Sequence, residues 1–443
     1  MATVQNYKCL ACGGPLGFDA ATGNLVCPYC DSTYSPEEMA KEAEKNGSAA
    51  ETSVGGDESQ WNTDNLSNDW GNEAENLRSY NCPSCGANIV CEKTTAATSC
   101  PYCNNPTVVE SHFAGSLKPD YIIPFKVIKQ KAVDSLKDFY KGKPLLPNTF
   151  ATSNHLEEVK GVYVPFYFFD GTARGSVSFH ATKVEHRSKG DEDETITSHF
   201  QCDREGEIDF KMVPVDASVQ MDDDIMDSIE PYDYKDLKDF STGFLPGYLA
   251  DIHDVSVEDC FERANTRCVG SCIQAMKETV TGYDSCRVST QNIKLKRGDV
   301  HYGLLPVYIL NTKFEEKKFV FAVNGQTGKL VGSLPSSVGK AVGRFFRHLF
   351  LSLVIEVIIA AIICVTSSDF LMDFKNDPLP IFVALGIFSL IFAGVGLCAD
   401  KKKMNTVSAA VEAKNYTAGG IKLSYSKDTF TNKTVQVTSR KTK

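Results

Sequence analysis

The longest apolar runs of the chain lie close to its C-terminal end. Residues 349–365 contain a single charged side chain, Glu356, and residues 379–398 contain none. At about 1.5 Å of rise per residue, roughly 20 helical residues cross a hydrocarbon core of about 30 Å. The pattern therefore predicts a transmembrane hairpin over 344–398, with helices at about 345–366 and 379–398.

Glu356 lies near the middle of the first predicted helix, where a carboxylate is costly and often functional. The second predicted helix offers no basic residue to pair with it. Two alternatives stay open. The carboxyl group is either a protonated residue without a role, or it makes a polar contact that associates the two helices.

Residues 119–335 show a different pattern, in which short runs rich in aromatic and β-branched residues alternate with polar turns. Such runs are typical of strands, whereas 129–141 and 256–281 show helical patterns. This mixture predicts a soluble α+β domain. Residues 161–183 and 303–325 each predict a β-hairpin, because in both segments two apolar runs flank a polar turn.

Residues 36–79 are rich in Glu, Asn, Ser and Gly and poor in aliphatic side chains. Such a stretch buries too little apolar surface to offset the entropy lost on ordering. We predict a flexible acidic linker, in which Trp61 and Trp70 are incidental aromatics. A short docking motif around the two tryptophans is the alternative.

Two segments of the chain share one cysteine pattern, a CxxC pair followed by fourteen residues and a second CxxC pair. This spacing is typical of four-thiolate zinc sites. The predicted ligands are Cys9, Cys12, Cys27 and Cys30 in a first ribbon over 1–35, and Cys82, Cys85, Cys100 and Cys103 in a second ribbon over 80–112. We therefore expect two small β ribbons, each holding one structural Zn²⁺.

The second pair of each segment reads CPYC, which is also the active-site string of glutaredoxins. A redox dithiol needs two cysteines, whereas a tetrahedral zinc site uses all four. Gly13, Gly86, Asp31 and Asn104 follow the CxxC pairs. These residue types tolerate the left-handed backbone that often follows the second cysteine of a zinc knuckle, so zinc binding is favoured over redox chemistry.

The charge and cysteine content narrow the function classes. A net charge of −10 and the scarcity of Lys and Arg in both ribbons disfavour nucleic-acid binding, which needs a basic surface. The first residues have no apolar core typical of a signal peptide, so a reducing compartment suits the sixteen cysteines better than secretion. The sequence contains no Ser–His–Asp, HExxH or Gly-rich nucleotide signature, and we expect no enzymatic activity.

Charge near the hairpin predicts its orientation. Lys340, Arg344 and Arg347 precede the first helix, and three lysines at 401–403 follow the second. The connecting loop has three aspartates against one lysine. By the positive-inside bias, we expect a cell-membrane protein with two helices and both termini in the cytoplasm. Residues 400–443 are then a basic cytoplasmic tail, either disordered or folded as a short hairpin that docks on the acidic middle domain or on an acidic partner.

Three smaller motifs predict structure rather than chemistry. The run MDDDIMD at 221–227 is expected to be a solvated acidic loop, and NGQTGK at 324–329 a tight turn. Cysteines at one stripe of the helix predicted over 256–281 should pack as small hydrophobes. These are Cys260, Cys268 and Cys272.

The paired ribbons, together with the strings IIPFK, YVPFYFFD, LLPVYILN and NGQTGKLVG ahead of a membrane hairpin, resemble transcription-factor-IIB-type zinc-ribbon membrane proteins of Gram-positive bacteria. Their genes often lie beside those of phage-shock-protein-A-like and flotillin-like proteins. The match covers the eight ribbon cysteines and, in the middle domain, only these short motifs. It implies a membrane-anchored scaffold that holds such protein partners at the cytoplasmic face, in an envelope stress response. The alternative is a membrane-tethered nucleic-acid-binding protein, because ribbons elsewhere bind nucleic acid.

Overall fold

The computed structural model describes most of the chain from residue 60 onwards. The described segments are 60–70, 77–92, 99–106, 108–111, 116–153, 159–189, 192–366, 379–408 and 412–439, with the single residues Ala74 and Ala97. Nearer the N-terminus it describes three short strands, β1 (Gly17–Asp19), β2 (Asn24–Val26) and β3 (Thr33–Tyr34), which pair as one antiparallel sheet. The cysteines of the first predicted ribbon lie outside the described residues.

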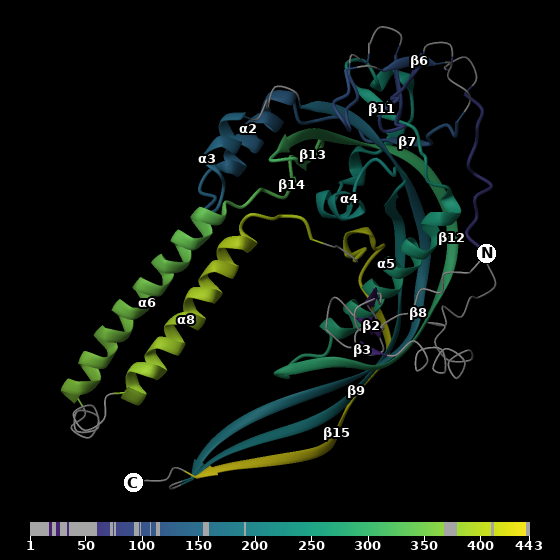
Figure 1. The fold of residues 1–443 in the computed structure, drawn as a ribbon. Coiled ribbons are helices and arrows are strands. Elements are labelled where there is room, and N and C mark those ends of the chain that lie inside the picture. Colours follow the sequence, from purple (N-terminus) through teal and green to yellow (C-terminus); the bar gives the residue numbers. More distant parts are fainter. Residues whose placement is uncertain are drawn as a thin grey trace.

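Five long strands build the centre of a mixed sheet. β8 (Lys160–Lys189) lies between β12 (Ser285–Phe314) and β9 (Glu192–Asp216) and pairs antiparallel with both. β13 (Lys317–Asn324) extends the sheet beyond β12, and β15 (Lys422–Ser439) extends it beyond β9. Together they form a curved band, and the ends of β8, β9 and β15 project from it (Figure 1).

The other strands of this sheet are short. They are β4 (Leu77–Asn81), β5 (Asn88–Glu92), β6 (Val109–Ser111), β7 (Tyr121–Ile122), β10 (Lys238–Asp239), β11 (Leu249–Asp251) and β14 (Leu330–Gly332). β11 pairs parallel with β8 and antiparallel with β5. Because β4, β5 and β6 belong to the second cysteine segment, that segment is part of the large sheet.

The β-hairpin predicted over 161–183 is wrong, because this segment lies entirely within β8. Its polar stretch does not turn, since β9 and β12 pair with it on either side. Gly175 permits the close approach of β12: a Cβ there would lie 2.0 Å from the Asn292 carbonyl oxygen. The second predicted hairpin is confirmed as β12 and β13, joined through Glu315 and Glu316 at positive φ.

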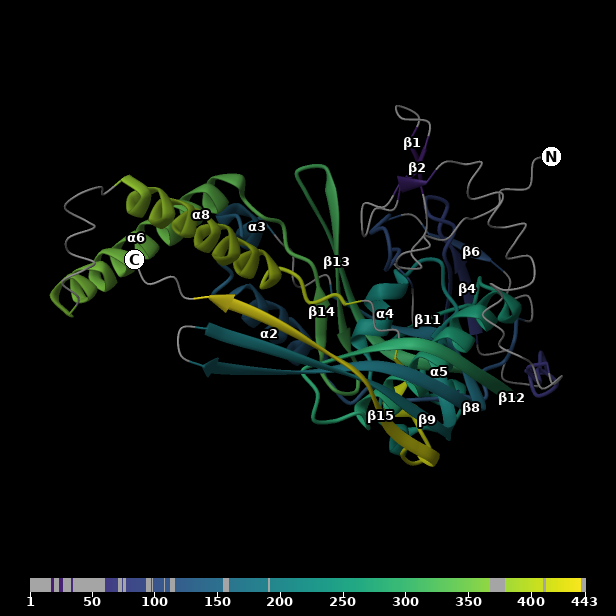
Figure 2. The same cartoon turned by 90° about the horizontal axis from the view of Figure 1, so that it is seen from below.

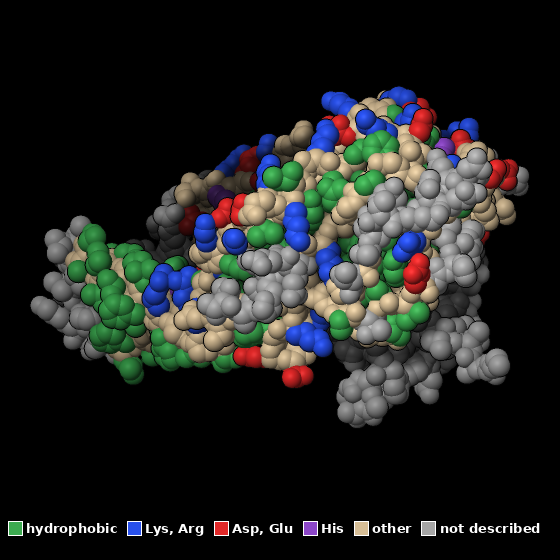
Figure 3. All heavy atoms as spheres, turned by 90° about the horizontal axis from the view of Figure 1, so that it is seen from above, with side chains coloured by type: hydrophobic (Ala, Val, Ile, Leu, Met, Phe, Trp, Pro, Cys, Tyr) green, Lys and Arg blue, Asp and Glu red, His purple; other side chains and the backbone are tan. Residues whose placement is uncertain are grey.

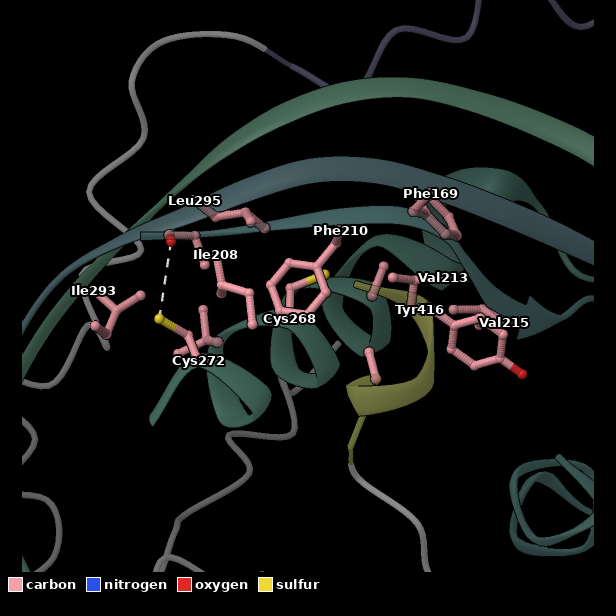
Figure 4. Packing of buried hydrophobic residues seen from close by; sticks show 14 of the residues in the cluster. Phe169, Ile208, Phe210, Val213, Val215, Cys268, Cys272, Ile293, Leu295 and Tyr416 are labelled. Carbon is pink, nitrogen blue, oxygen red and sulfur yellow. Dashed lines mark hydrogen bonds between the residues drawn. The ribbon is translucent and has the colours of Figure 1, made fainter. Parts of the chain in front are cut away.

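Helices cover the concave face of the band. α5 (Val257–Glu278) lies along this face and packs against the long strands (Figures 1 and 4). Ser256 caps its N-terminus by accepting a hydrogen bond from the Asp259 N–H. Figure 4 shows Cys268 and Cys272 among the apolar side chains of the strands, which confirms the expected core packing of the cysteine stripe.

The remaining helices of the domain are short. They are α2 (Lys129–Tyr140), α3 (Asn148–Ser153), α4 (Asp223–Ile229) and the 3₁₀ turns Tyr234–Asp236, Thr242–Phe244 and Lys414–Tyr416. α4 corrects the solvated loop predicted over 221–227. Asp222 caps this helix, and Arg263 of α5 forms ion pairs with Asp223 and Asp227 at 3.0 and 2.7 Å. The acidic run folds because its charges are capped and paired.

NGQTGK at 324–329 is the expected tight turn. The Asn324 side-chain oxygen accepts hydrogen bonds from the N–H groups of Gln326 and Thr327, both at 2.9 Å. Gly328 adopts a φ of 81° and its N–H donates to the Asn324 carbonyl oxygen. The turn connects β13 to β14, which pair as antiparallel strands.

Residues 60–70 correct the flexible linker predicted over 36–79. Trp61 is 5% exposed, and its ring meets that of Phe169 edge-on at 4.9 Å. Trp70 is 8% exposed, and its indole N–H donates to the Ser116 carbonyl oxygen at 2.7 Å. The two tryptophans therefore anchor this segment to the domain, which is the docking alternative.

The C-terminal segment is part of the domain rather than a separate basic tail. β15 is one strand along β9 instead of the predicted short hairpin. Arg204 of β9 donates to Asp428 of β15 at 2.6 Å. Before β15, Tyr416 is 4% exposed and stacks on the ring of Tyr234. Docking on the middle domain thus occurs, in the form of strand addition.

α6 (Val338–Thr366) and α8 (Leu379–Lys402) lie side by side and extend away from the sheet (Figures 1 and 2). Both are long and apolar enough to cross a membrane, and only 11% of each apolar stretch is buried. Figure 3 shows this hydrophobic surface in green, with a group of Lys and Arg side chains where it meets the rest of the molecule.

The burial of Trp61 generates a stability prediction. Trp61→Ala should lower the free energy of unfolding by about 3–5 kcal/mol, the usual cost of deleting a large buried aromatic side chain. Urea unfolding of the full chain in detergent, followed by circular dichroism, measures it. Val219→Ala is the control, because Val219 is 67% exposed and should change the value by about 0.5 kcal/mol or less. If both variants changed the free energy of unfolding equally, Trp61 would not anchor the segment, as expected for a flexible linker.

Candidate metal centre

The second cysteine segment folds into two matching knuckles. In the first, the Gly86 N–H donates to the Cys82 carbonyl oxygen at 2.9 Å, and in the second, the Asn104 N–H donates to that of Cys100 at 3.1 Å. Gly86 and Asn104 have φ angles of 80° and 58°. The left-handed backbone expected after each of these CxxC pairs is therefore present, and it turns each pair of cysteines toward one point.

The four thiols of this segment converge. The Sγ atoms of Cys82 and Cys103 are 3.6 Å apart, as are those of Cys85 and Cys100. All four sulfur atoms lie within 4.8 Å of one another. Four sulfurs held at ~2.3 Å from one tetrahedral ion would be about 3.8 Å apart. The cluster therefore fits a metal ion, and four protein ligands leave no position open for a substrate.

The protonation of these thiols depends on their surroundings. Burial raises the pKa of Cys100 and that of Cys85. For Cys82, burial is the largest single influence and raises the pKa, but hydrogen bonds from the N–H groups of Cys85 and Ser84 and with the thiols of Cys103 and Cys85 together lower it to about 7. A bound cation would favour the thiolate form of all four, so metal affinity should rise with pH.

Tyr102, inside the second CPYC string, connects the knuckle to the α+β domain. Its side chain is 2% exposed, and its hydroxyl donates to Asp251 Oδ2 at 2.7 Å. The Ser218 hydroxyl donates to the same oxygen at 2.7 Å. Burial raises the pKa of Asp251 to about 7, although both donors favour its charged form. The same tetrapeptide thus supplies two cysteines of the cluster and an anchor in the domain.

The backbone of this knuckle is held by further contacts. The Asn311 side-chain amide donates to the Pro101 carbonyl oxygen at 2.8 Å, and the Asn104 amide donates to the Asn311 carbonyl oxygen at 3.0 Å. Lys160 Nζ donates to the Cys100 carbonyl oxygen at 3.0 Å. With the β5–β11 pairing, these contacts make the second ribbon an integral part of the domain.

The structure brings together one of the two predicted ligand sets, Cys82, Cys85, Cys100 and Cys103. The other set, Cys9, Cys12, Cys27 and Cys30, lies outside the described residues and stays a prediction. Sequence reasoning missed the role of Tyr102 and its acceptor Asp251. The repeated CPYC string draws attention to the tyrosine, but no local pattern indicates a carboxylate so distant in the sequence.

Polar contacts also join α6 to α8. Glu356 accepts hydrogen bonds from the Ser352 hydroxyl at 3.0 Å and from the Ser389 hydroxyl at 2.9 Å. Closer to the domain, Asp400 accepts one from Arg344 Nε at 2.8 Å. Glu356 therefore makes the helix-associating contact, through hydroxyls rather than a basic residue. Sequence reasoning missed Ser389, because which face it presents depends on how the helices pack.

Comparison with known proteins gives a relative that matches most of the length of this chain. The chain is 34% identical over 332 residues to the "Uncharacterized protein YdjG" of Bacillus subtilis (strain 168), covering 75% of this chain and 90% of the relative. No protein-family model matches the chain. No solved structure matches it either.

The Tyr102–Asp251 contact predicts that the knuckle and the domain are energetically coupled. Tyr102→Phe should lower the free energy of unfolding by about 1–3 kcal/mol, because buried Asp251 loses a donor. Metal content should not change, since the sulfurs are untouched. Tyr425→Phe, at a 47% exposed ring, is the matched control and should cost about 0.5 kcal/mol or less. If Tyr102→Phe left the free energy of unfolding in urea unchanged, the ribbon would be independent of the domain.

Proposed function

The chain belongs to the same family as the B. subtilis protein, and we propose that it is a membrane-anchored scaffold. In this proposal α6 and α8 cross the membrane. The metal-binding ribbons and the α+β domain hold protein partners at the cytoplasmic face. The resemblance seen in the sequence suggests phage-shock-protein-A-like or flotillin-like proteins as partners, and envelope stress as the setting.

The observation that supports this proposal most is the place of the hairpin within the sheet. α6 follows β14, and after α8 the chain returns to β14: the Leu334 N–H donates to the Met404 carbonyl oxygen at 2.9 Å, and the Thr406 N–H to that of Gly332 at 3.0 Å. β15 then pairs with β9. One domain is thus built from residues on both sides of the hairpin. Both flanks must lie on the same side of any membrane that the hairpin crosses.

The cytoplasm is the side that we propose for this domain. Arg347, Lys401 and Lys402 are exposed at the base of the hairpin, and such cations favour the cytoplasmic flank of membrane helices. Thiolate ligands also persist best in a reducing compartment. Charge and cysteine chemistry are independent, and both favour cytoplasmic termini.

Zinc is the metal that we propose, because four thiolates in a tetrahedral arrangement are a common structural zinc set. With the first cysteine set, the chain would hold two ions. A closed site of this kind stabilises its fold and supplies no catalytic position. This favours a role in holding shape for binding over a role in chemistry.

A free strand edge offers a surface for partners. The projecting end of the sheet, which we call the blade, consists of 183–189 of β8, 192–199 of β9 and 432–439 of β15 (Figure 2). Among the described residues, no strand lies beside the outer edge of β15. Val435 and Val437 are 49% and 53% exposed there. An edge of this kind can accept a strand from another protein.

Metal analysis tests the zinc proposal. The full chain, purified under reducing conditions, should contain close to two zinc ions per chain. Cys100→Ser should remove one ion and lower the melting temperature of the α+β domain, because structural zinc supplies much of the folding energy of its module. Cys27→Ser should also remove one ion but leave that melting temperature unchanged. Zinc content that is insensitive to Cys100→Ser would contradict the assignment.

Fractionation with an anchor-free variant tests the scaffold proposal. Residues 338–402 can be replaced by a short Gly-Ser loop, because Leu334 and Met404 are hydrogen-bonded to each other at 2.9 Å. Protein partners that co-purify with the natural chain from mild detergent should follow this variant into the soluble fraction. The co-purification should resist nuclease. Recovery of nucleic acid alone, lost on nuclease treatment, would instead favour the nucleic-acid-binding alternative.

A further inference from the structure

We propose that the base of the hairpin binds an anionic phospholipid. Its acyl chain would lie in an apolar groove between α6 and α8, with the phosphate against unpaired cations at the rim. This inference rests on the proposed insertion of the hairpin in a membrane and adds a ligand class that the scaffold proposal does not require.

The groove lies between the first turns of α6 and the last turns of α8. Its volume is about 470 Å³. Its apolar walls are formed by Val338, Val342, Phe345, Phe346 and Leu397. Val338 and Val342 are 78% and 51% exposed, although they lie on the domain side of the span predicted to begin at residue 345. The domain does not bury these two valines, so another apolar group would have to shield them from water.

The length of α6 places this groove at the boundary between the headgroup layer and the hydrocarbon core. The helix has 29 residues, about 43 Å at 1.5 Å per residue, whereas the hydrocarbon core is about 30 Å thick. Tilting can absorb excess length. However, the first turns contain Lys340, Arg344 and Arg347, whose charges are too costly to bring into hydrocarbon. The start of α6 therefore lies beside lipid phosphates.

The rim of the groove is positively charged. Lys401 lines the groove, and Lys402 and Arg347 are exposed nearby at the ends of the same two helices. None of the three forms an ion pair with an acidic side chain in the described part of the chain, whereas Arg344 is paired with Asp400. A chain with a net charge of −10 thus leaves free cations where its apolar surface begins (Figure 3).

The two features together select the ligand. A zwitterionic lipid would fill the groove but gain little from the cations. A soluble phosphate would gain the charge interaction with these cations but would leave the groove uncovered. An anionic phospholipid satisfies both, since its acyl chain covers the valines while its phosphate meets Lys401.

Lipid titration of the full chain in detergent tests this site. Phosphatidylglycerol and phosphatidylcholine with identical acyl chains are added separately, and bound lipid is counted by native mass spectrometry. One phosphatidylglycerol should be retained more tightly than phosphatidylcholine. Lys401→Ala should weaken the binding of phosphatidylglycerol about 5-fold, the ratio that corresponds to about 1 kcal/mol. The binding of phosphatidylcholine should not change.

A matched pair of substitutions tests the groove itself. Val342→Trp should fill it and remove the tightly held lipid. Val357→Trp is the control, because Val357 is on the same helix and 65% exposed but does not line the groove. Equal retention of the two lipids, or equal effects of the two tryptophans, would overturn the site. Displacement of the lipid by glycerol phosphate would also overturn it, since the cations would then suffice.

Alkaline carbonate extraction of membranes separates this inference from the scaffold proposal. Release of the chain into the soluble fraction would show that the hairpin does not cross the membrane, and would contradict both proposals. A chain that stays with the membrane but shows no preference for phosphatidylglycerol would overturn the lipid site alone.

Discussion

The pairing of β8 along both of its edges is the interaction on which the rest of the structure depends. β12 occupies one edge, and the other edge pairs first with β11 and then with β9. From Phe166 to Thr182, the backbone of β8 has a strand partner on both sides even where its side chains are polar. Through β11, this strand positions the second cysteine segment, and through β9 it positions β15. Two parts of the chain far apart in sequence therefore take their place from one strand.

A buried ion pair joins α5 to the residue that follows α4, and it also contacts the segment that follows the hairpin. Arg267 of α5 is 2% exposed, and its two terminal nitrogens donate to the Glu230 carboxylate at 3.0 and 2.7 Å. One of them also donates to the Glu412 carbonyl oxygen at 3.5 Å. Burial raises the pKa of Glu230, while Arg267 acts in the opposite direction. Since removing one partner would leave a buried charge uncompensated, the contact specifies where the returning chain lies.

The metal centre and the apolar hairpin are attached to the domain in different ways. The second ribbon joins through strand pairing and the buried Tyr102–Asp251 contact. The hairpin joins at β14, where the chain leaves the sheet and returns to it. Both attachments are short and hydrogen-bonded. A force or displacement at the hairpin would therefore reach the domain through β14 rather than through a flexible tether, which suits a scaffold that must hold a surface at a fixed place.

Features that depend on local composition and spacing could be predicted from the amino-acid sequence. The CxxC spacing predicted the convergence of Cys82, Cys85, Cys100 and Cys103, because ligand spacing and knuckle backbone are local properties. The apolar runs predicted α6 and α8, because length and hydropathy decide whether a helix can cross a membrane.

Features that depend on partners distant in sequence could not be predicted, because they arise from contacts formed on folding. The segment 161–183 is a strand rather than a hairpin because β9 and β12 pair with it. Trp61 is buried in the domain rather than exposed in a linker, because its ring packs against Phe169. The C-terminal residues form β15 because β9 presents a free edge. The same residues in isolation would favour a turn, a linker and a tail, since local propensity is weak compared with the burial and hydrogen bonds that long-range pairing supplies.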